Sequence, residues 1–429
     1  MKKQYLFSFL SLGLIFTSNA QTDCDQGRYA TDVYSTINIS NDILYGNNVS
    51  NTGSSTDLFF DFYEPDGDTS TARPLIVWAH GGSFIGGSRT ASDIVELSNR
   101  FAKKGFVCAS ISYRLGMGLP PNQESATKAV LRAVQDMKAA VRYFYKDRQT
   151  TNTYKIDTTQ IFIAGSSAGA LMAYHYAYLD KPCELEGFIA EADVTAMGGL
   201  EGNSGNAGYS SKAKAAIGLA GAIGSYGWLE VGDMPFCGTH GTNDGTVPYN
   251  RGLISVFGFP VMTIDGTRMM HEQAEAIGLS HKLYSHYGKD HVPHASEPLT
   301  MDTTEWFIRD FLIEQLGCSE TALQPENAPL QSSILYQLTF CGLGIETMNI
   351  EGVKSIYPNP SSDKIFIELT DAAAVNEIQL IDLAGRIQHV NSPTSTISVI
   401  EKGNLVSGTY ILRISYTDGS FSTNKIAFQ

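Results

Sequence analysis

The sequence is poor in positive charge and has no long apolar run. Lys and Arg together number 30 against 44 Asp and Glu, which gives a net charge of −14. An acidic chain is poorly suited to binding nucleic acid or docking on anionic membranes. No apolar stretch reaches the ~18 residues that a membrane-spanning helix needs, so no such helix is expected.

Cysteine is also scarce, and the six cysteines show no C-x-x-C pair or Cys/His spacing typical of zinc. Cys108 and Cys237 lie in apolar runs and are expected to be buried thiols. The disulfide pairing is left open. Apolar residues make up 43% of the 429 residues, so a sizeable core and two or three domains are expected.

Residues 1–20 have the pattern of a secretory signal peptide. Lys2 and Lys3 precede a mostly apolar run over 5–16, and the small residues at 18–20 suit cleavage. Export is therefore expected, and an exported chain can form disulfides.

Alternating strand and helix patterns predict an α/β domain over residues 21–318. The apolar runs at 74–80 and 106–113 are typical of strands buried on both faces. Residues 92–104 and 124–146 have helical spacing. This alternation predicts βαβ units, and so a mostly parallel sheet flanked by helices.

Residues 196–232 are rich in glycine and show little periodicity. One interpretation is a loop-rich insertion that covers a functional site. The other is that the glycines allow close packing of regular elements; they are Gly218, Gly221, Gly224 and Gly227.

The composition changes after residue 318. Residues 319–350 are predicted to be a linker. Residues 351–429 show short alternating segments separated by turn signals, among them 365–369 and 409–414. About seven such strands predict a small all-β sandwich.

A Gly-x-Ser-x-Gly motif follows the apolar run at 161–164. A serine in a sharp strand-to-helix turn has a strained backbone and needs very small neighbours. Gly165, Ala168 and Gly169 meet that need, so Ser167 is predicted to be an exposed nucleophile. Ser166 has the wrong position in the motif.

A second motif, His80 to Phe84, follows the strand that ends at Ala79. A glycine turn there can aim backbone N–H groups at a developing oxyanion, and each such donor contributes about 3 kcal/mol. The candidate donors are the N–H groups of Gly82, Ser83 and Ala168. His80 is expected to brace this loop and is not assigned as a base.

An activated serine also needs an imidazole base and an acid that orients it. Asp244 follows an apolar run, as expected at the carboxyl end of a strand, and Asp193 is the weaker alternative acid. The base is expected in the Gly-containing loop after a late strand. His291 is the first choice there, with His294 and then His286 as alternatives.

The order Ser167, Asp244, His291 is that of the α/β-hydrolases. Together with the His-Gly-Gly and Gly-x-Ser-x-Gly motifs, residues 58–316 resemble their secreted esterase/lipase branch. Ser83 and Ser166 depart from the commonest forms of these motifs. The resemblance implies a serine carboxylic-ester hydrolase that forms an acyl-enzyme and needs no metal or organic cofactor.

Four apolar side chains next to the motifs are candidates for substrate binding: Phe84, Ile85, Tyr113 and Tyr249. Three other functions remain open. They are a peptidase of the same fold, an esterase removing acetyl or feruloyl groups from polysaccharide, and a non-catalytic adhesion module.

The C-terminal segment resembles the sorting domain of type IX secretion. The resemblance rests on Tyr-Pro-Asn-Pro at 357–360, on Leu-Val-Ser-Gly-Thr-Tyr at 405–410 and on Lys425. It implies recognition by the type IX machinery and release or attachment at the cell surface. A carbohydrate-binding or adhesive sandwich is the alternative, although no aromatic platform favours it.

Overall fold

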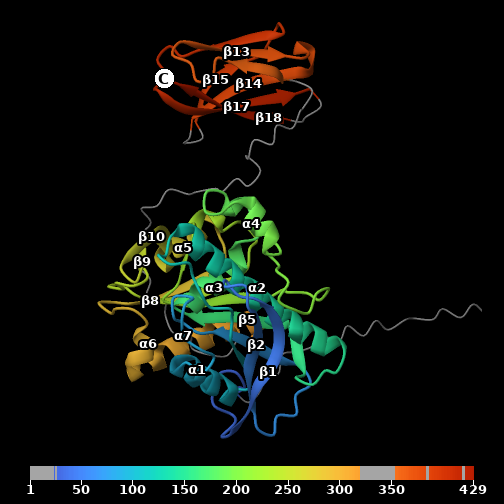
Figure 1. Ribbon diagram of the computed structural model, residues 1–429, viewed down its shortest axis with the longest axis vertical. Coiled ribbons are helices and arrows are strands. Elements are labelled where there is room, and N and C mark those ends of the chain that lie inside the picture. Colours follow the sequence, from blue (N-terminus) through green and yellow to red (C-terminus); the bar gives the residue numbers. More distant parts are fainter. Residues whose placement is uncertain (1–23, 25–26, 319–352, 383–385, 418–420) are drawn as a thin grey trace, which may run out of the picture. The chain divides into compact units, whose positions relative to one another are not determined.

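The computed structural model describes residues 24, 27–318, 353–382, 386–417 and 421–429 (Figure 1). The chain divides into two units, Met1–Leu338 and Thr339–Gln429. The predicted signal peptide (1–20) and linker (319–350) lie outside the described residues. Within these described parts, none of the helices is both long and apolar enough to cross a bilayer.

The first unit contains an eight-stranded sheet of order β1-β2-β4-β3-β5-β6-β8-β11. The six strands from β4 to β11 run parallel to one another, and β2 is antiparallel to both β4 and β1. The strands are β1 (Ile37–Val49), β2 (Ser55–Pro65), β3 (Arg73–Ala79), β4 (Val107–Ile111), β5 (Ile156–Ser166), β6 (Ala215–Leu219), β8 (Phe236–Gly241) and β11 (His281–His286).

Helices cover both faces of this sheet, as the apolar strand β3 requires. Leu75 and Val77 belong to the core that includes α2 and α3, whereas Ile76 and Trp78 belong to the core that includes α1 and α7. Side chains alternate along a strand, so a strand apolar on both faces needs two helical layers. The helices are α1 (Ser92–Lys103), α2 (Gln123–Gln149), α3 (Ala168–Tyr178), α4 (Glu191–Ala196), α5 (Thr267–Ile277), α6 (Pro293–Ser296) and α7 (Pro298–Leu316).

The predicted α/β fold with a mostly parallel sheet is confirmed. The two helices expected at 92–104 and 124–146 correspond to α1 and α2. Helix α2 begins at a capping box, in which the Asn122 side chain accepts from the Ser125 N–H and the Ser125 hydroxyl accepts from the Asn122 N–H.

The glycine-rich segment 196–232 is not a loop throughout. Residues 215–219 form β6, a buried strand between β5 and β8. A Cβ on Gly218 would lie 2.2 Å from the Tyr174 ring, and one on Gly224 would lie 2.5 Å from the Trp228 ring. At these positions glycine allows close packing of regular elements, which was one of the two interpretations of the segment.

A small antiparallel sheet and two 3-10 turns lie beside the main sheet in the first unit. The sheet has the order β7 (Ala222–Ile223), β10 (Phe259–Gly266) and β9 (Arg251–Val256). The turns are η2 (Pro182–Leu185) and η3 (Tyr226–Trp228).

A disulfide joins Cys24 to Cys318, 294 residues further along the chain. It ties the two ends of the α/β domain together, and a crosslink that closes a long loop stabilises a fold by about 2–5 kcal/mol. Cys183 is disulfide-bonded as well, whereas Cys108 and Cys237 are buried thiols, as expected for cysteines inside β4 and β8.

The second unit is an antiparallel β-sandwich, as predicted. A three-stranded sheet and a four-stranded sheet share one apolar core, which includes Ile365 and Ile367 from the first and Ile378, Leu412 and Ile414 from the second. The sheets are β12 (Val353–Tyr357), β13 (Lys364–Leu369) and β16 (Ile397–Glu401), and β15 (Ile387–Asn391), β14 (Val375–Asp382), β17 (Gly408–Tyr416) and β18 (Phe421–Phe428); a short 3-10 turn, η4 (Ala372–Ala374), precedes β14.

Candidate active site

Ser167 lies in a sharp turn between β5 and α3. Its backbone has φ 54° and ψ −116°, a strained conformation for a residue with a side chain. A Cβ on Gly165 would lie 2.2 Å from the Gly169 carbonyl, and one on Gly169 would lie 2.1 Å from the Ala79 carbonyl oxygen. The two motif glycines therefore allow the strand, the helix and β3 to approach closely enough to form this turn.

The structure brings Ser167, His291 and Asp244 together from three loops. His291 Nε2 lies 2.8 Å from Ser167 Oγ, and His291 Nδ1 lies 2.7 Å from Asp244 Oδ2. The three residues follow the carboxyl ends of β5, β8 and β11, which meet at one edge because these strands are parallel. With its proton on Nδ1, the imidazole donates to Asp244 and presents its Nε2 lone pair to the serine hydroxyl.

The Asp244 carboxylate is held by several donors. Its Oδ1 accepts the N–H groups of Thr246 and Val247, both at 2.8 Å, and its Oδ2 lies 3.1 Å from His240 Nε2. Burial alone would raise the pKa of Asp244, but the hydrogen bonds from His240 and His291 lower it well below its usual range. The carboxylate therefore stays ionised in neutral and mildly acidic solution.

Sequence reasoning did not assign a role to two residues that support the Asp244 and His291 loops, His240 and Asp290. His240 lies four positions before Asp244, near the end of β8, and this short spacing was the available signal. Asp290 precedes His291, and its Oδ1 accepts the N–H groups of Gly245 and His291 at 2.9 and 2.7 Å. That carboxylate ties the loop of the acid to the loop of the imidazole.

The His80–Phe84 loop turns sharply beside Ser167. Gly82, Ser83 and Phe84 all have positive φ, and a Cβ on Gly81 would lie 3.2 Å from the Ser167 Cβ. Ser83 and Ala168 line the same cavity as Ser167. Among the described residues, no backbone carbonyl outside the regular elements accepts the N–H groups of Gly82, Ser83 or Ala168.

The alternative bases and the alternative acid have other partners. His294 Nε2 lies 3.2 Å from the Oγ of Ser166 and 3.4 Å from the Oδ2 of Asp93, so it faces the neighbouring serine. His286 Nε2 lies 3.2 Å from the Thr304 hydroxyl. Asp193 pairs with the ammonium of a lysine on α2 at 3.0 Å. None of the three contacts Ser167.

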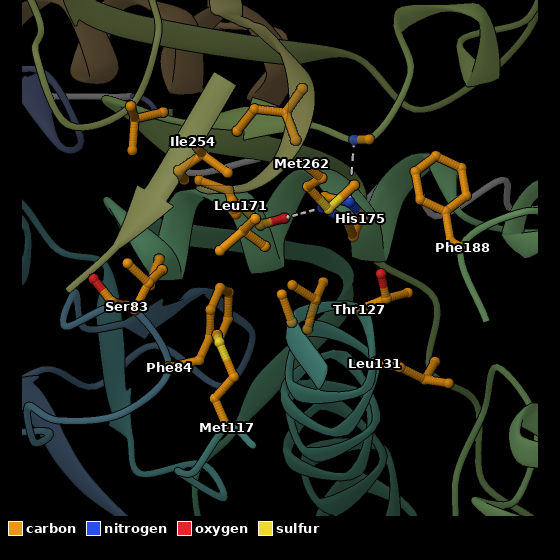
Figure 2. A pocket seen from close by; sticks show the side chains of 18 of the residues that line it. Ser83, Phe84, Met117, Thr127, Leu131, Leu171, His175, Phe188, Ile254 and Met262 are labelled. Atoms are coloured by element: carbon orange, nitrogen blue, oxygen red, sulfur yellow. Dashed lines mark hydrogen bonds between the residues drawn. The ribbon is translucent and has the colours of Figure 1, made fainter. Parts of the chain in front are cut away.

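A cavity opens beside Ser167 and has a largely apolar lining (Figure 2). Its walls come from α2, α3, the β9–β10 hairpin and the segment from η2 to η3. The lining includes Phe84, Met117, Leu131, Leu171, Leu185, Phe188, Trp228, Ile254 and Met262.

His175 is the one histidine in this lining, and it is uncharged at neutral pH. Its Nδ1 lies 2.7 Å from the Leu171 carbonyl oxygen, and its Nε2 accepts the Gly224 N–H at 3.2 Å (Figure 2). Burial lowers the pKa of His175 to about 4. The cavity therefore suits an apolar group.

Of the four side chains predicted to bind substrate, Phe84 lines this cavity. Tyr113 instead stacks on the His80 ring, with centroids 4.4 Å apart, and donates to the His80 carbonyl oxygen at 2.9 Å. Tyr249 is buried, and its hydroxyl lies 2.6 Å from that of Ser285. Ile85 packs against the main core. Their places next to a motif in sequence did not bring these three side chains to the cavity.

A buried carboxyl group, that of Glu184, lies next to the cavity-lining residue Leu185. Glu184 lies in η2, and only 2% of its surface is exposed. Its Oε2 accepts the N–H groups of Asp180 and Lys181, at 2.9 and 3.0 Å, while its Oε1 has no partner among the described residues. Burial raises the pKa of Glu184 from 4.5 to about 7, against those hydrogen bonds.

We expect Glu184→Gln to stabilise the protein more at pH 8 than at pH 5. Between about pH 4.5 and 7 the folded chain keeps a proton that the unfolded chain has lost, so stability falls as pH rises. An amide resembles the protonated acid and removes this loss. Thermal unfolding at the two pH values measures the difference, with the exposed Glu186→Gln as the matched control. An equal effect of Glu184→Gln at both pH values would contradict the expectation.

Part of the first unit matches an esterase-like α/β-hydrolase family. Residues 60–198 match the BD-FAE family, and residues 355–429 match the family described as the secretion system C-terminal sorting domain. The chain thus combines an esterase-like α/β-hydrolase domain with a type IX sorting domain, and type IX secretion exports it to the cell surface or the medium.

Solved structures of an esterase from Thermogutta terrifontis are similar to this chain. Thermogutta terrifontis esterase 2 phosphoramylated by tabun is 22% identical, with a TM-score of 0.48 over 68% of this chain and 97% of that one. The propionate-bound form of a thermophilic esterase from the same organism is 22% identical, with a TM-score of 0.47 over 65% and 96%. A comparison with curated proteins finds no match.

Proposed function

We propose that this protein is a serine carboxylic-ester hydrolase that acts outside the cell on esters with an apolar acyl or aryl group. The observation that carries the proposal is the chain of hydrogen bonds from Ser167 through His291 to Asp244 at the mouth of an apolar cavity. The BD-FAE match and the type IX sorting domain support the class and the location.

In the proposed reaction Ser167 Oγ attacks the ester carbonyl carbon while His291 Nε2 takes the hydroxyl proton. Asp244 holds the imidazole in the tautomer that presents Nε2 and stabilises the imidazolium that forms. The tetrahedral oxyanion accepts the N–H groups of Gly82, Ser83 and Ala168, each of which contributes about 3 kcal/mol.

Collapse of the tetrahedral intermediate breaks the bond to the alcohol, and His291 gives its proton to the leaving oxygen. The acyl group then remains on Ser167 as an ester. Water attacks this acyl-enzyme with His291 again as base, which releases the acid and restores the serine hydroxyl.

The cavity supports an ester substrate with an apolar group over a charged one. Its lining is largely aliphatic and aromatic, and its one histidine is neutral. Transfer of an apolar acyl or aryl group from water into this cavity is favourable by about 25 cal/mol per Å² of apolar surface buried. A non-catalytic adhesion module would not need these three groups in register, whereas the His291 imidazole lies within hydrogen-bond distance of both the Ser167 hydroxyl and the Asp244 carboxylate.

A fluorophosphonate probe tests the proposal directly. Ser167 Oγ should displace fluoride from phosphorus, and fragment mass spectra should place the label on Ser167 and not on Ser166. Heat-unfolded protein, in which the three side chains no longer meet, should not react. Absence of label on the folded protein, or label on another serine, would contradict the proposed nucleophile.

A further inference from the structure

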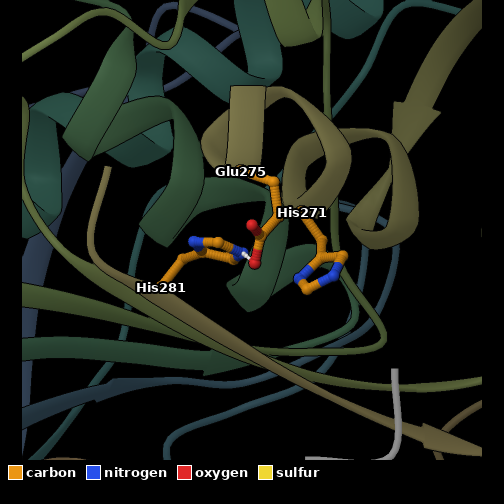
Figure 3. Close-up of side chains that lie close together, drawn as sticks. All are labelled: His271, Glu275 and His281. Carbon is orange, nitrogen blue, oxygen red and sulfur yellow. Dashed lines mark ion pairs between the residues drawn. The ribbon is translucent and has the colours of Figure 1, made fainter. Parts of the chain in front are cut away.

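A second cluster of ionisable side chains lies away from Ser167. His271 and Glu275 are one turn apart on α5, and His281 is the first residue of β11. One ligand atom from each lies within 4.8 Å of the other two (Figure 3). His291 follows the carboxyl end of β11, so His281 marks the opposite edge of the parallel sheet.

The two imidazoles are buried but lack hydrogen bonds on the atoms that face the cluster. His271 is 7% exposed and the His281 side chain is 6% exposed. Among the described residues, His271 Nδ1 and His281 Nε2 have no hydrogen-bond partner. A buried polar atom without a partner costs about 1–3 kcal/mol, so two of them side by side call for an explanation.

The contacts of His281 set its tautomer. Its Nδ1 lies 2.7 Å from the Leu279 carbonyl oxygen, so in the neutral ring Nδ1 carries the proton and Nε2 carries a lone pair. That lone pair lies 3.5 Å from a Glu275 carboxylate oxygen, which is also an acceptor. A cation between the two acceptors would turn this repulsion into attraction.

The chemistry of the donors points to one class of cation. Two imidazole nitrogens and one carboxylate oxygen form a ligand set that zinc accepts, with water in the fourth position. Histidines that bind metals usually donate their other N–H to a backbone carbonyl, as His281 does to Leu279. Glu275 is on the exposed side, which leaves room for entry of the ion and for the water ligand.

We propose that His271, Glu275 and His281 bind one Zn²⁺ ion. The ion joins α5 to the start of β11 and so acts on stability, at a distance from the proposed active site. The search for Cys/His spacing did not identify this cluster, because it combines a helical i, i+4 pair with a residue from the next strand.

Calorimetric titration of ZnCl₂ into the metal-free, untagged protein tests this site. We expect one Zn²⁺ per chain and a higher unfolding temperature in excess Zn²⁺, reversed by a chelator. Glu275→Gln is the main variant, since the exposed Glu275 side chain can change without loss of the fold. It should weaken Zn²⁺ binding by at least about tenfold. The double variant His271→Gln/His281→Gln should abolish binding.

His291→Gln is the matched control, because it removes an imidazole that pairs with a carboxylate near the opposite edge of the sheet. This variant should bind Zn²⁺ as the unchanged protein does. Three results would overturn the proposal. They are no Zn²⁺ binding by the unchanged protein, equal affinity in Glu275→Gln, and loss of binding in His291→Gln.

Discussion

Ser167→Ala is expected to lower kcat toward p-nitrophenyl acetate by a factor on the order of 10⁴ to 10⁶. The proposed reaction needs the hydroxyl that lies 2.8 Å from His291 Nε2, and alanine removes that oxygen alone. Backbone strain at φ 54° is the same for alanine and serine, so the fold should persist. Steady-state hydrolysis, with circular dichroism and thermal unfolding as checks of the fold, measures the effect.

The neighbouring serine provides a matched control. Ser166→Ala also removes one hydroxyl from the same turn, but that hydroxyl lies 3.2 Å from His294. Its kcat is expected to stay within about tenfold of the unchanged enzyme, as for a substitution outside the reacting groups. If Ser167→Ala kept a tenth of the activity, or if both variants lost activity equally, Ser167 would not be the nucleophile.

Asp244→Asn is expected to lower kcat by a factor on the order of 10⁴. The carboxylate accepts from His291 Nδ1 at 2.7 Å, which leaves the Nε2 lone pair facing the serine. The amide that replaces it can donate to Nδ1, which moves the imidazole proton to Nε2, where it blocks proton transfer from Ser167. Thr246 and Val247 can still donate to the amide oxygen, so the loop should keep its conformation.

A second aspartate that pairs with a histidine in the described part of the chain provides the matched control. Asp93 lies 3.4 Å from His294 Nε2 and belongs to α1. Asp93→Asn changes the same chemical group beside an imidazole that does not contact Ser167, and its kcat should stay within about tenfold. An equal loss of kcat in the two variants would indicate a general effect on the fold. Nearly full activity in Asp244→Asn would exclude Asp244 as the residue that orients the base.

Much of the fold could be predicted because its signals are local. The apolar runs of β3 and β4 and the helical spacing of α1 and α2 each lie within a short window. Strand β6 escaped prediction for a physical reason. It is short, and it contains Gly218, a residue type that is also common in loops. Glycine is required there because the Tyr174 ring packs directly against this position of the strand.

In the candidate site, too, some residues could be proposed from local sequence signals and others could not. Ser167, Asp244 and His291 could be proposed because each follows a strand in a short motif, although His291 lies 124 and 47 residues from its two partners. The cavity wall could not be proposed in this way. Ile254 and Met262 reach it from the β9–β10 hairpin, and Phe188 from the segment after η2.

The sequence by itself determined the class of fold, the sorting domain and the three candidate residues at the strand ends, since strand burial, turn geometry and short motifs are properties of neighbours in the chain. Only the tertiary structure decided the pairing of Cys24 with Cys318, the stacking of Tyr113 on His80, and the meeting of His271 with His281. These contacts join residues from separate elements, and their partners depend on how whole helices and strands pack.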